Sequence, residues 1–182
     1  MIIKDDNSVH CSGSIIAPKR LLTAGHCFAN NSDNYIPKER LRVVFGIHDL
    51  NMLDLSFVNK TIRNIKRVIV HPDYSWQEAY SDLVILEVDK KVTFSETIFP
   101  VCLPDYENSD KNHLVRESVT VVGFGPKNEE SKTMRQISQK IRSFNFCNER
   151  YNPENADIQL RPLIRKELPY GFDDTLICAQ NW

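Results

Sequence analysis

The sequence predicts an all-β protein built from short strands. Long helical periodicity is absent, and short helices are expected only at Ala24–Ala29 and Phe144–Tyr151. Five runs of apolar and β-branched residues are each bounded by Gly, Pro, Asn or Asp, as strands separated by turns are; they are Val9–Ile16, Leu41–Ile47, Ile62–Val70, Leu83–Val88 and Val119–Phe124. Many short strands with turns between them favour a barrel or a sandwich.

The composition is that of an ordinary globular protein. The 182 residues include 26% charged and 41% hydrophobic residues and carry a formal net charge of −1. This near-neutral charge gives no reason to expect nucleic acid or an anionic membrane as a partner. No apolar run is long enough to span a bilayer.

Two polar stretches suggest how the chain is organised. We interpret the stretch from Asp105 to Glu117 as a connector between two domains, residues 1–104 and 105–182, the alternative being a surface loop within one domain. The second polar stretch, Asn148–Glu167, is expected to form a long excursion.

The cysteines favour an oxidising compartment. There are five, at positions 11, 27, 102, 147 and 178, without a C-x-x-C pair. An odd number in a secreted protein predicts one thiol that pairs outside the chain. The first residues, M-I-I-K-D-D, do not form a signal peptide. Because the cysteines carry more weight, we expect the sequence to begin late in a secreted protein.

The segment from Cys11 to Cys27 carries the strongest chemical signal. It reads C-S-G-S-I-I-A-P-K-R-L-L-T-A-G-H-C, which predicts two strands joined by a turn and then His26 in a tight turn. A general base needs an imidazole held at a fixed angle, and a disulfide beside it would supply that rigidity. A lone histidine would otherwise be an ordinary surface or core residue.

A zinc site is the alternative for this segment. His10, Cys11, His26 and Cys27 offer two imidazoles and two thiols. Neighbours on a strand point to opposite faces, so His10 and Cys11 would not readily share one ion. A disulfide between Cys11 and Cys27 is the simpler interpretation.

This segment resembles C-G-G-S-L-I…V-L-T-A-A-H-C of the trypsin-like serine proteases. Six further resemblances to that family follow in chain order, from the strand that begins at Arg42 to the segment around Cys178; they are R-V-V-F-G-I-H-D-L, H-P-D-Y, S-D-L-V-I-L-E-V, F-P-V-C-L-P, V-G-F-G and T-L-I-C-A. The F-G-I-H-D-L and P-V-C-L-P forms look most like the arthropod clip-domain branch.

The resemblance implies a fold and a chemistry. The fold is two antiparallel Greek-key β-barrels, the second incomplete in this sequence. The activity is serine-type endopeptidase action on a protein or peptide substrate. His26 matches the base that takes the proton from the serine, and Asp82 matches the carboxylate that orients it. Without the S-D-L-V-I-L-E-V motif, Asp82 would be interpreted as a residue that caps a strand.

The remaining cysteines also match family positions. Cys11–Cys27 and Cys147–Cys178 resemble two family disulfides. Cys102 falls where the family links its catalytic domain to a pro-domain or light chain, the alternative being a free buried thiol. Asn30 and Asn59 stand in N-N-S and N-K-T glycosylation motifs, which matter if the protein is extracellular as its family is.

No cofactor or metal is expected. Ile47 stands where the calcium loop of the family has a ligating glutamate.

Two family motifs have no counterpart in the 182 residues. They are Gly-Asp-Ser-Gly-Gly, which supplies the nucleophile and the oxyanion hole, and the Ile-Val-Gly-Gly start. We therefore expect a chain that is truncated at both ends and does not cleave peptides by itself. The alternatives are a non-catalytic homologue that acts as a binding or regulatory module, and a β-domain with a zinc site.

Overall fold

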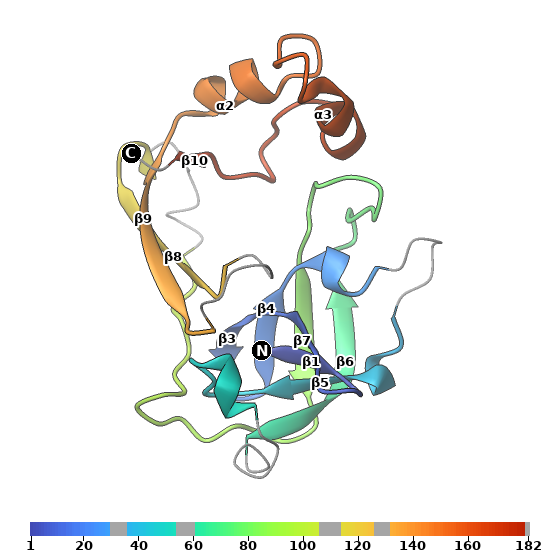
Figure 1. The fold of residues 1–182 in the computed structure, drawn as a ribbon, viewed down its shortest axis with the longest axis vertical. Coiled ribbons are helices and arrows are strands. Elements are labelled where there is room, and N and C mark those ends of the chain that lie inside the picture. Colours follow the sequence, from blue (N-terminus) through green and yellow to red (C-terminus); the bar gives the residue numbers. More distant parts are fainter. Residues whose placement is uncertain (30–35, 54–60, 106–113, 126–131, 181–182) are drawn as a thin grey trace. The chain divides into compact units, whose positions relative to one another are not determined.

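The computed structural model describes residues 1–29, 36–53, 61–105, 114–125 and 132–180 (Figure 1). Asn30 and Asn59, the predicted glycosylation acceptors, lie outside the described residues. The chain forms two compact units. The first consists of Met1–Pro72, Leu83–Leu103 and Gly123–Arg135, and the second of Asp73–Asp82, Pro104–Val122 and Gln136–Trp182.

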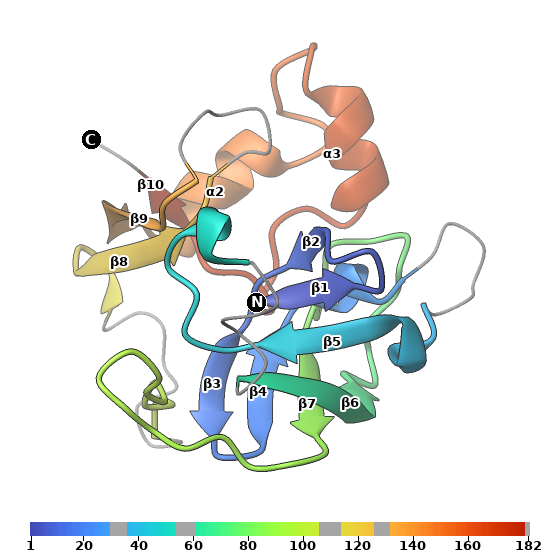
Figure 2. The same ribbon diagram turned by 60° about the horizontal axis from the view of Figure 1, so that its bottom comes forward.

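The first unit is built on an antiparallel sheet of seven strands in the order β2-β1-β5-β6-β7-β4-β3 (Figure 2). The strands are β1 Ile2–Lys4, β2 Val9–Cys11, β3 Ser14–Ala17, β4 Arg20–Thr23, β5 Leu41–Val44, β6 Ile62–Val70 and β7 Val84–Val88. The two strands at the ends of this order, β2 and β3, are consecutive in the chain and separated only by Ser12 and Gly13. The sheet therefore closes on itself as a barrel. Because β5 returns to lie beside β1, the barrel has a Greek-key connection.

The core of this barrel follows from the alternation of side chains along its strands. In β7, Val84, Leu86 and Val88 are buried while Ile85 and Glu87 between them are only half-buried. They join an apolar cluster that also includes Ile2, Leu21, Phe28, Leu41, Val43, Phe45, Ile65, Val92 and Ile98. Burying each large apolar side chain contributes about 1.5–3 kcal/mol to folding.

The predicted strand Val9–Ile16 is wrong as a single element, because the chain turns a corner between β2 and β3. At this corner the Thr23 hydroxyl donates to the Ser12 carbonyl oxygen at 2.7 Å. A Cβ atom on Gly13 would lie 3.0 Å from the Leu22 carbonyl oxygen, so the close approach of these strands requires glycine. The two strands at the ends of the sheet order thus meet at this corner.

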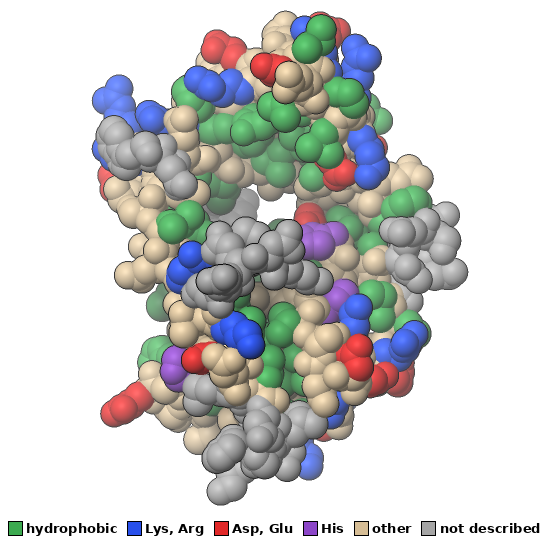
Figure 3. Space-filling model, viewed as in Figure 1, with side chains coloured by type: hydrophobic (Ala, Val, Ile, Leu, Met, Phe, Trp, Pro, Cys, Tyr) green, Lys and Arg blue, Asp and Glu red, His purple; other side chains and the backbone are tan. Residues whose placement is uncertain are grey.

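A second sheet has three strands in the order β10-β9-β8. They are β8 Ser118–Gly123, β9 Arg135–Ile141 and β10 Ala179–Gln180. Val121, Val122 and Ile137 on these strands are between 46% and 57% exposed, so much of their apolar surface is not covered. Figure 3 shows hydrophobic side chains gathered at the surface near the α2–α3 region as well. This matches the expected incomplete second barrel.

Two helices accompany this sheet in the second unit. Helix α2, Phe144–Tyr151, begins where the Ser143 hydroxyl accepts a hydrogen bond from the Phe146 amide, as an N-cap does. Helix α3, Arg161–Glu167, has Pro162 in its first turn. Neither helix is long and apolar enough to cross a membrane, and the same holds for every helix in the described part of the chain.

The mostly-β fold is confirmed, and so are the bounds of β6 and α2. The predicted strands Leu41–Ile47, Leu83–Val88 and Val119–Phe124 are present with bounds shifted by one to three residues. The helix expected over Ala24–Ala29 is a single 3-10 turn, η1, at Gly25–Cys27. Two further 3-10 turns, η2 Lys38–Arg40 and η3 Leu50–Met52, flank β5. β1, β9, β10 and α3 were not predicted.

Candidate active site

The backbone around His26 is fixed in a compact turn after β4. The amides of Phe28 and Ala29 both donate to the Gly25 carbonyl oxygen, at 2.9 and 3.2 Å. Gly25 and Cys27 are buried, whereas the His26 side chain between them is exposed. The turn thus presents an imidazole to the surface from a rigid support, as a proton-transfer group needs.

A disulfide between Cys11 and Cys27 ties this turn to the end of β2. Its Cα atoms are 6.2 Å apart, and the Cys27 side is buried. The turn that carries His26 is therefore covalently joined to the barrel at the residue that follows the histidine.

His10 supports the same turn from β2. Its Nε2 atom lies 2.6 Å from the carbonyl oxygen of Cys27, and its side chain is half-buried. Because a carbonyl oxygen can only accept, Nε2 carries the proton and donates it. His10 thus holds the backbone next to His26.

The zinc alternative fails on the same geometry. Among the described residues, Cys11, His26 and Cys27 bring potential ligand atoms within 4.8 Å of one another. The sulfur atoms of Cys11 and Cys27, however, are bonded to each other. A cysteine binds zinc as a thiolate and not as part of a disulfide. His10 is not part of this cluster, and its Nε2 is engaged with the Cys27 carbonyl oxygen.

The pairing of β4 with β7 fixes the starting points of two short segments, the one that runs from Thr23 to His26 and the one that runs from Val84 back to Asp82. Thr23 pairs with Val84 in this antiparallel ladder. His26 follows Thr23 by three residues, and Asp82 precedes Val84 by two. The chain therefore leaves β4 toward His26 at the same end of the ladder at which it enters β7 from Asp82.

Asp82 lies between two anchored residues. On its C-terminal side, the Leu83 carbonyl oxygen accepts a hydrogen bond from the His71 amide at 2.9 Å. On its N-terminal side, the buried Ser81 has a φ of 51°, in the left-handed region that residues other than glycine rarely adopt. Such strained backbone persists where surrounding contacts hold it, and it concentrates at functional sites.

Sequence reasoning did not identify the residues that hold Ser81. Its amide lies 3.3 Å from the hydroxyl of Thr175, and the hydroxyl of its neighbour Tyr80 donates to the Gly171 carbonyl oxygen at 2.6 Å. The two residues of each pair are more than 90 positions apart in the chain. No local pattern signals them, although Ser81 and Thr175 each open a segment that resembles the protease family.

The other cysteines are placed as follows. A second disulfide joins Cys147 in α2 to Cys178, the residue before β10. Cys102 has a free thiol and is exposed, so the alternative of a buried thiol is wrong. Its neighbour Val101 is held to the barrel through a hydrogen bond to the Ile15 carbonyl oxygen at 2.8 Å.

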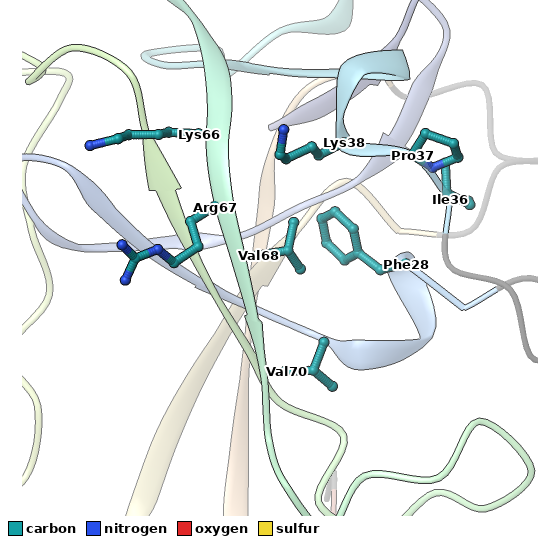
Figure 4. A pocket seen from close by; sticks show the side chains of 8 residues that line it. All are labelled: Phe28, Ile36, Pro37, Lys38, Lys66, Arg67, Val68 and Val70. Carbon is teal, nitrogen blue, oxygen red and sulfur yellow. The ribbon is translucent and has the colours of Figure 1, made fainter.

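A pocket of about 480 Å³ lies on the first unit, with Phe28 in its wall. It is lined by Phe28, Ile36, Pro37, Lys38, Lys66, Arg67, Val68 and Val70. Figure 4 shows Phe28 facing Val68 and Val70, while Lys66 and Arg67 extend away from them. Lys38 and Lys66 are paired with Glu39 and Glu87. Two of the three positive charges that line the pocket therefore have a neighbouring carboxylate as a partner.

Comparison with known proteins agrees with this architecture. Residues 2–181 match the family described as Trypsin. The chain is 34% identical to a venom protease of Bombus pensylvanicus over 116 residues, which are 63% of this chain and 44% of the relative. It is 28% identical to a venom serine protease of Polistes dominula over 163 residues, covering 87% of this chain and 56% of the relative.

A third relative is the clotting factor G beta subunit of Tachypleus tridentatus, 27% identical over 175 residues, or 93% of this chain and 50% of that protein. The chain spans about half the length of these curated relatives. All three are arthropod proteins, in agreement with the predicted arthropod branch. The match over nearly the whole length shows that the chain belongs to the trypsin family of serine proteases.

Proposed function

We propose that this chain is part of a serine endopeptidase in which His26 acts as the general base and Asp82 as its carboxylate partner. The observation that carries the proposal is the pairing of Thr23 with Val84. Because of this pairing, the short segments that lead to His26 and to Asp82 begin at the same end of a hydrogen-bonded ladder. In the catalytic triad, the histidine takes the proton of the nucleophile while the aspartate fixes its tautomer and stabilises the imidazolium.

The surroundings of His26 suit this role. The disulfide Cys11–Cys27 and the hydrogen bond from His10 limit movement of the turn. The exposed imidazole remains accessible to a substrate and to a nucleophile. Proton transfer depends steeply on such positioning.

The nucleophile is not proposed among these residues. None of the serines in the 182 residues stands in a G-x-S-G context. Without a nucleophile and an oxyanion hole, the base has no group to activate. We therefore expect the 182-residue chain by itself to show no peptide hydrolysis.

The setting of the enzyme is proposed from its cysteines. Two disulfides fit an oxidising, extracellular compartment. The exposed thiol of Cys102 suits a covalent link to a pro-domain or light chain. A disulfide-linked species in the secreted protein that disappears in Cys102→Ser would support this link, and its persistence would count against it.

A second candidate is a non-catalytic homologue that binds partners. It would require that the whole protein, like these 182 residues, contain no G-x-S-G serine. The intact His26 and Asp82 disfavour it, because binding alone does not require that pair.

The test uses the secreted protein, taken as the longest form that its gene produces. Peptide hydrolysis by this form is expected to fall by about 10⁴-fold or more in His26→Ala. His48→Ala is the matched control, because this exposed histidine of the same unit lies outside the site. Hydrolysis that survives in His26→Ala would contradict the proposal. A longest form that stays inactive after its pro-domain has been cleaved would favour the second candidate.

A further inference from the structure

We propose that Tyr80 and Thr175 are positioning residues for Asp82, acting through the backbone of Ser81. We call Tyr80, Ser81, Gly171 and Thr175 the aspartate clamp. The inference rests on the proposed function, since it takes Asp82 as the carboxylate that orients the base.

Three consecutive residues before Asp82 are each bonded to one distant segment, Glu167–Thr175. The Ala79 amide donates to the Glu167 carbonyl oxygen at 2.8 Å. Tyr80 and Ser81 follow with bonds to Gly171 and Thr175. All of these residues belong to the second unit. Each of the three residues that precede Asp82 is thereby held by its own hydrogen bond.

The Tyr80 hydroxyl joins two backbone groups of the partner segment. It donates to the Gly171 carbonyl oxygen at 2.6 Å and accepts from the Tyr170 amide at 3.0 Å. Tyr80 is only 8% exposed, so the loss of its hydroxyl would leave both groups poorly satisfied. Phenylalanine would keep the ring and remove both bonds.

The Thr175 hydroxyl is also oriented from both sides. It donates to the Asp173 carboxylate at 2.6 Å, which leaves its lone pair for the Ser81 amide at 3.3 Å. Asp173 in turn accepts from the Thr175 amide at 2.8 Å. This chain of bonds holds Ser81 at its unusual φ of 51°.

The clamp matters because Asp82 stands between Ser81 and the β7 ladder. Leu83, the residue after Asp82, accepts a hydrogen bond from the His71 amide within the first unit, and the clamp holds Ser81, the residue before Asp82, within the second unit. A carboxylate that orients a base must be held to within about 0.5 Å. Neither Tyr80 nor Thr175 needs to touch the reacting atoms to serve this purpose.

The experiment measures three properties of the secreted protein in Tyr80→Phe and Thr175→Val. They are amide exchange at Ser81 and Asp82, the Nδ1–H proton resonance of His26, and kcat and KM for a peptide. Tyr170→Phe is the matched control for Tyr80, because Tyr170 contributes its backbone amide and its side chain is 80% exposed. Thr175→Ser is the conservative control, because it keeps the hydroxyl.

We expect exchange at Ser81 and Asp82 to rise at least about tenfold in both clamp variants, while the ladder between β4 and β7 keeps its protection. The His26 resonance should broaden or shift, and kcat should fall by about 10- to 100-fold with KM unchanged. Tyr170→Phe and Thr175→Ser should match the unmodified protein in each measurement.

The outcomes separate this inference from the proposed function. If Asp82→Asn alters the His26 resonance and kcat but both clamp variants leave them unchanged, the clamp is overturned and the catalytic pair stands. If Asp82→Asn alters neither, the proposed function fails, and the inference that depends on it fails with it. Should Tyr80→Phe not fold, Thr175→Val alone decides, because Thr175 is an exposed residue and the substitution removes only its hydroxyl.

Discussion

Thr23 lies opposite Val84 in the ladder between β4 and β7, and its hydroxyl also donates to the Ser12 carbonyl oxygen at 2.7 Å. The buried Thr23 thus takes part in two features. One is the corner that closes the barrel, and the other is the ladder at whose end the chain continues to His26 and to Asp82. The closure of the barrel and the placement of the candidate base therefore depend on the same residue.

Replacing this threonine tests that contact. Thr23→Val keeps the shape but leaves the Ser12 carbonyl oxygen without its donor, so we expect a loss of about 1–2 kcal/mol in the free energy of unfolding. Urea denaturation measures it. The exposed Thr93→Val should stay within about 0.5 kcal/mol of the unmodified protein. Equal effects of the two substitutions would show that the Thr23 hydroxyl contributes nothing specific.

Gly46 is expected to tolerate replacement by alanine much less well than Gly123. Its φ is +73°, and a Cβ atom there would lie 3.1 Å from Cγ1 of Ile98 in the core. Gly46→Ala should therefore cost more than about 1 kcal/mol, through both strain and crowding. Gly123→Ala is the control, because a Cβ atom on Gly123 meets nothing within 4 Å. Thermal unfolding of the two variants would refute this if Gly123→Ala were the more destabilised.

The disulfide at the His26 turn should contribute measurably to stability. Cys11 and Cys27 are 16 positions apart, and closing a loop of that length stabilises a protein by about 3 kcal/mol. The double substitution of both cysteines by alanine should lower the denaturation midpoint accordingly. Cys102→Ser is the control in the 182-residue chain, where this thiol is free and exposed, and it should leave the midpoint unchanged. A midpoint that does not move in the double variant would contradict the structural role of this bond.

Stability at alkaline pH should depend on Tyr80. Burial is the largest effect on this residue and raises the pKa of Tyr80 above its ordinary value of 10.0. The unfolded chain then loses its proton at a lower pH than the folded chain, so stability falls as the pH rises through and above 10. Tyr80→Phe should remove this part of the decline in urea midpoints measured between about pH 9 and pH 11. Tyr170→Phe should keep it, and an unchanged decline in Tyr80→Phe would refute the assignment.

The features that the sequence predicted well are those with a strong local signal. β6 is a nine-residue run rich in isoleucine and valine, and its bounds agree with the prediction. The segment around His26 was recognisable because glycine, histidine and cysteine occur together after a strand. Helix α2 begins at Ser143, a residue that favours the start of a helix.

The features that were missed depend on tertiary contacts. β9 reads R-Q-I-S-Q-K-I and is largely exposed, so it lacks the apolar run that marks a strand. β1 has only three residues before charged ones follow, and α3 lies within a stretch that looks like a polar loop. The aspartate clamp joins residues about 90 positions apart, and no sequence pattern near Tyr80 indicates that Gly171 is its partner.

The most direct test of the central claim is a double-mutant cycle between His26 and Asp82. It measures kcat/KM of the secreted protein for a peptide substrate in His26→Ala, Asp82→Asn and the double variant. If the two act as one unit, each single substitution lowers kcat/KM by about 10⁴-fold or more, and the double variant is no worse than His26→Ala. Independent effects that multiply in the double variant, or an Asp82→Asn protein with full activity, would contradict the assignment of this pair.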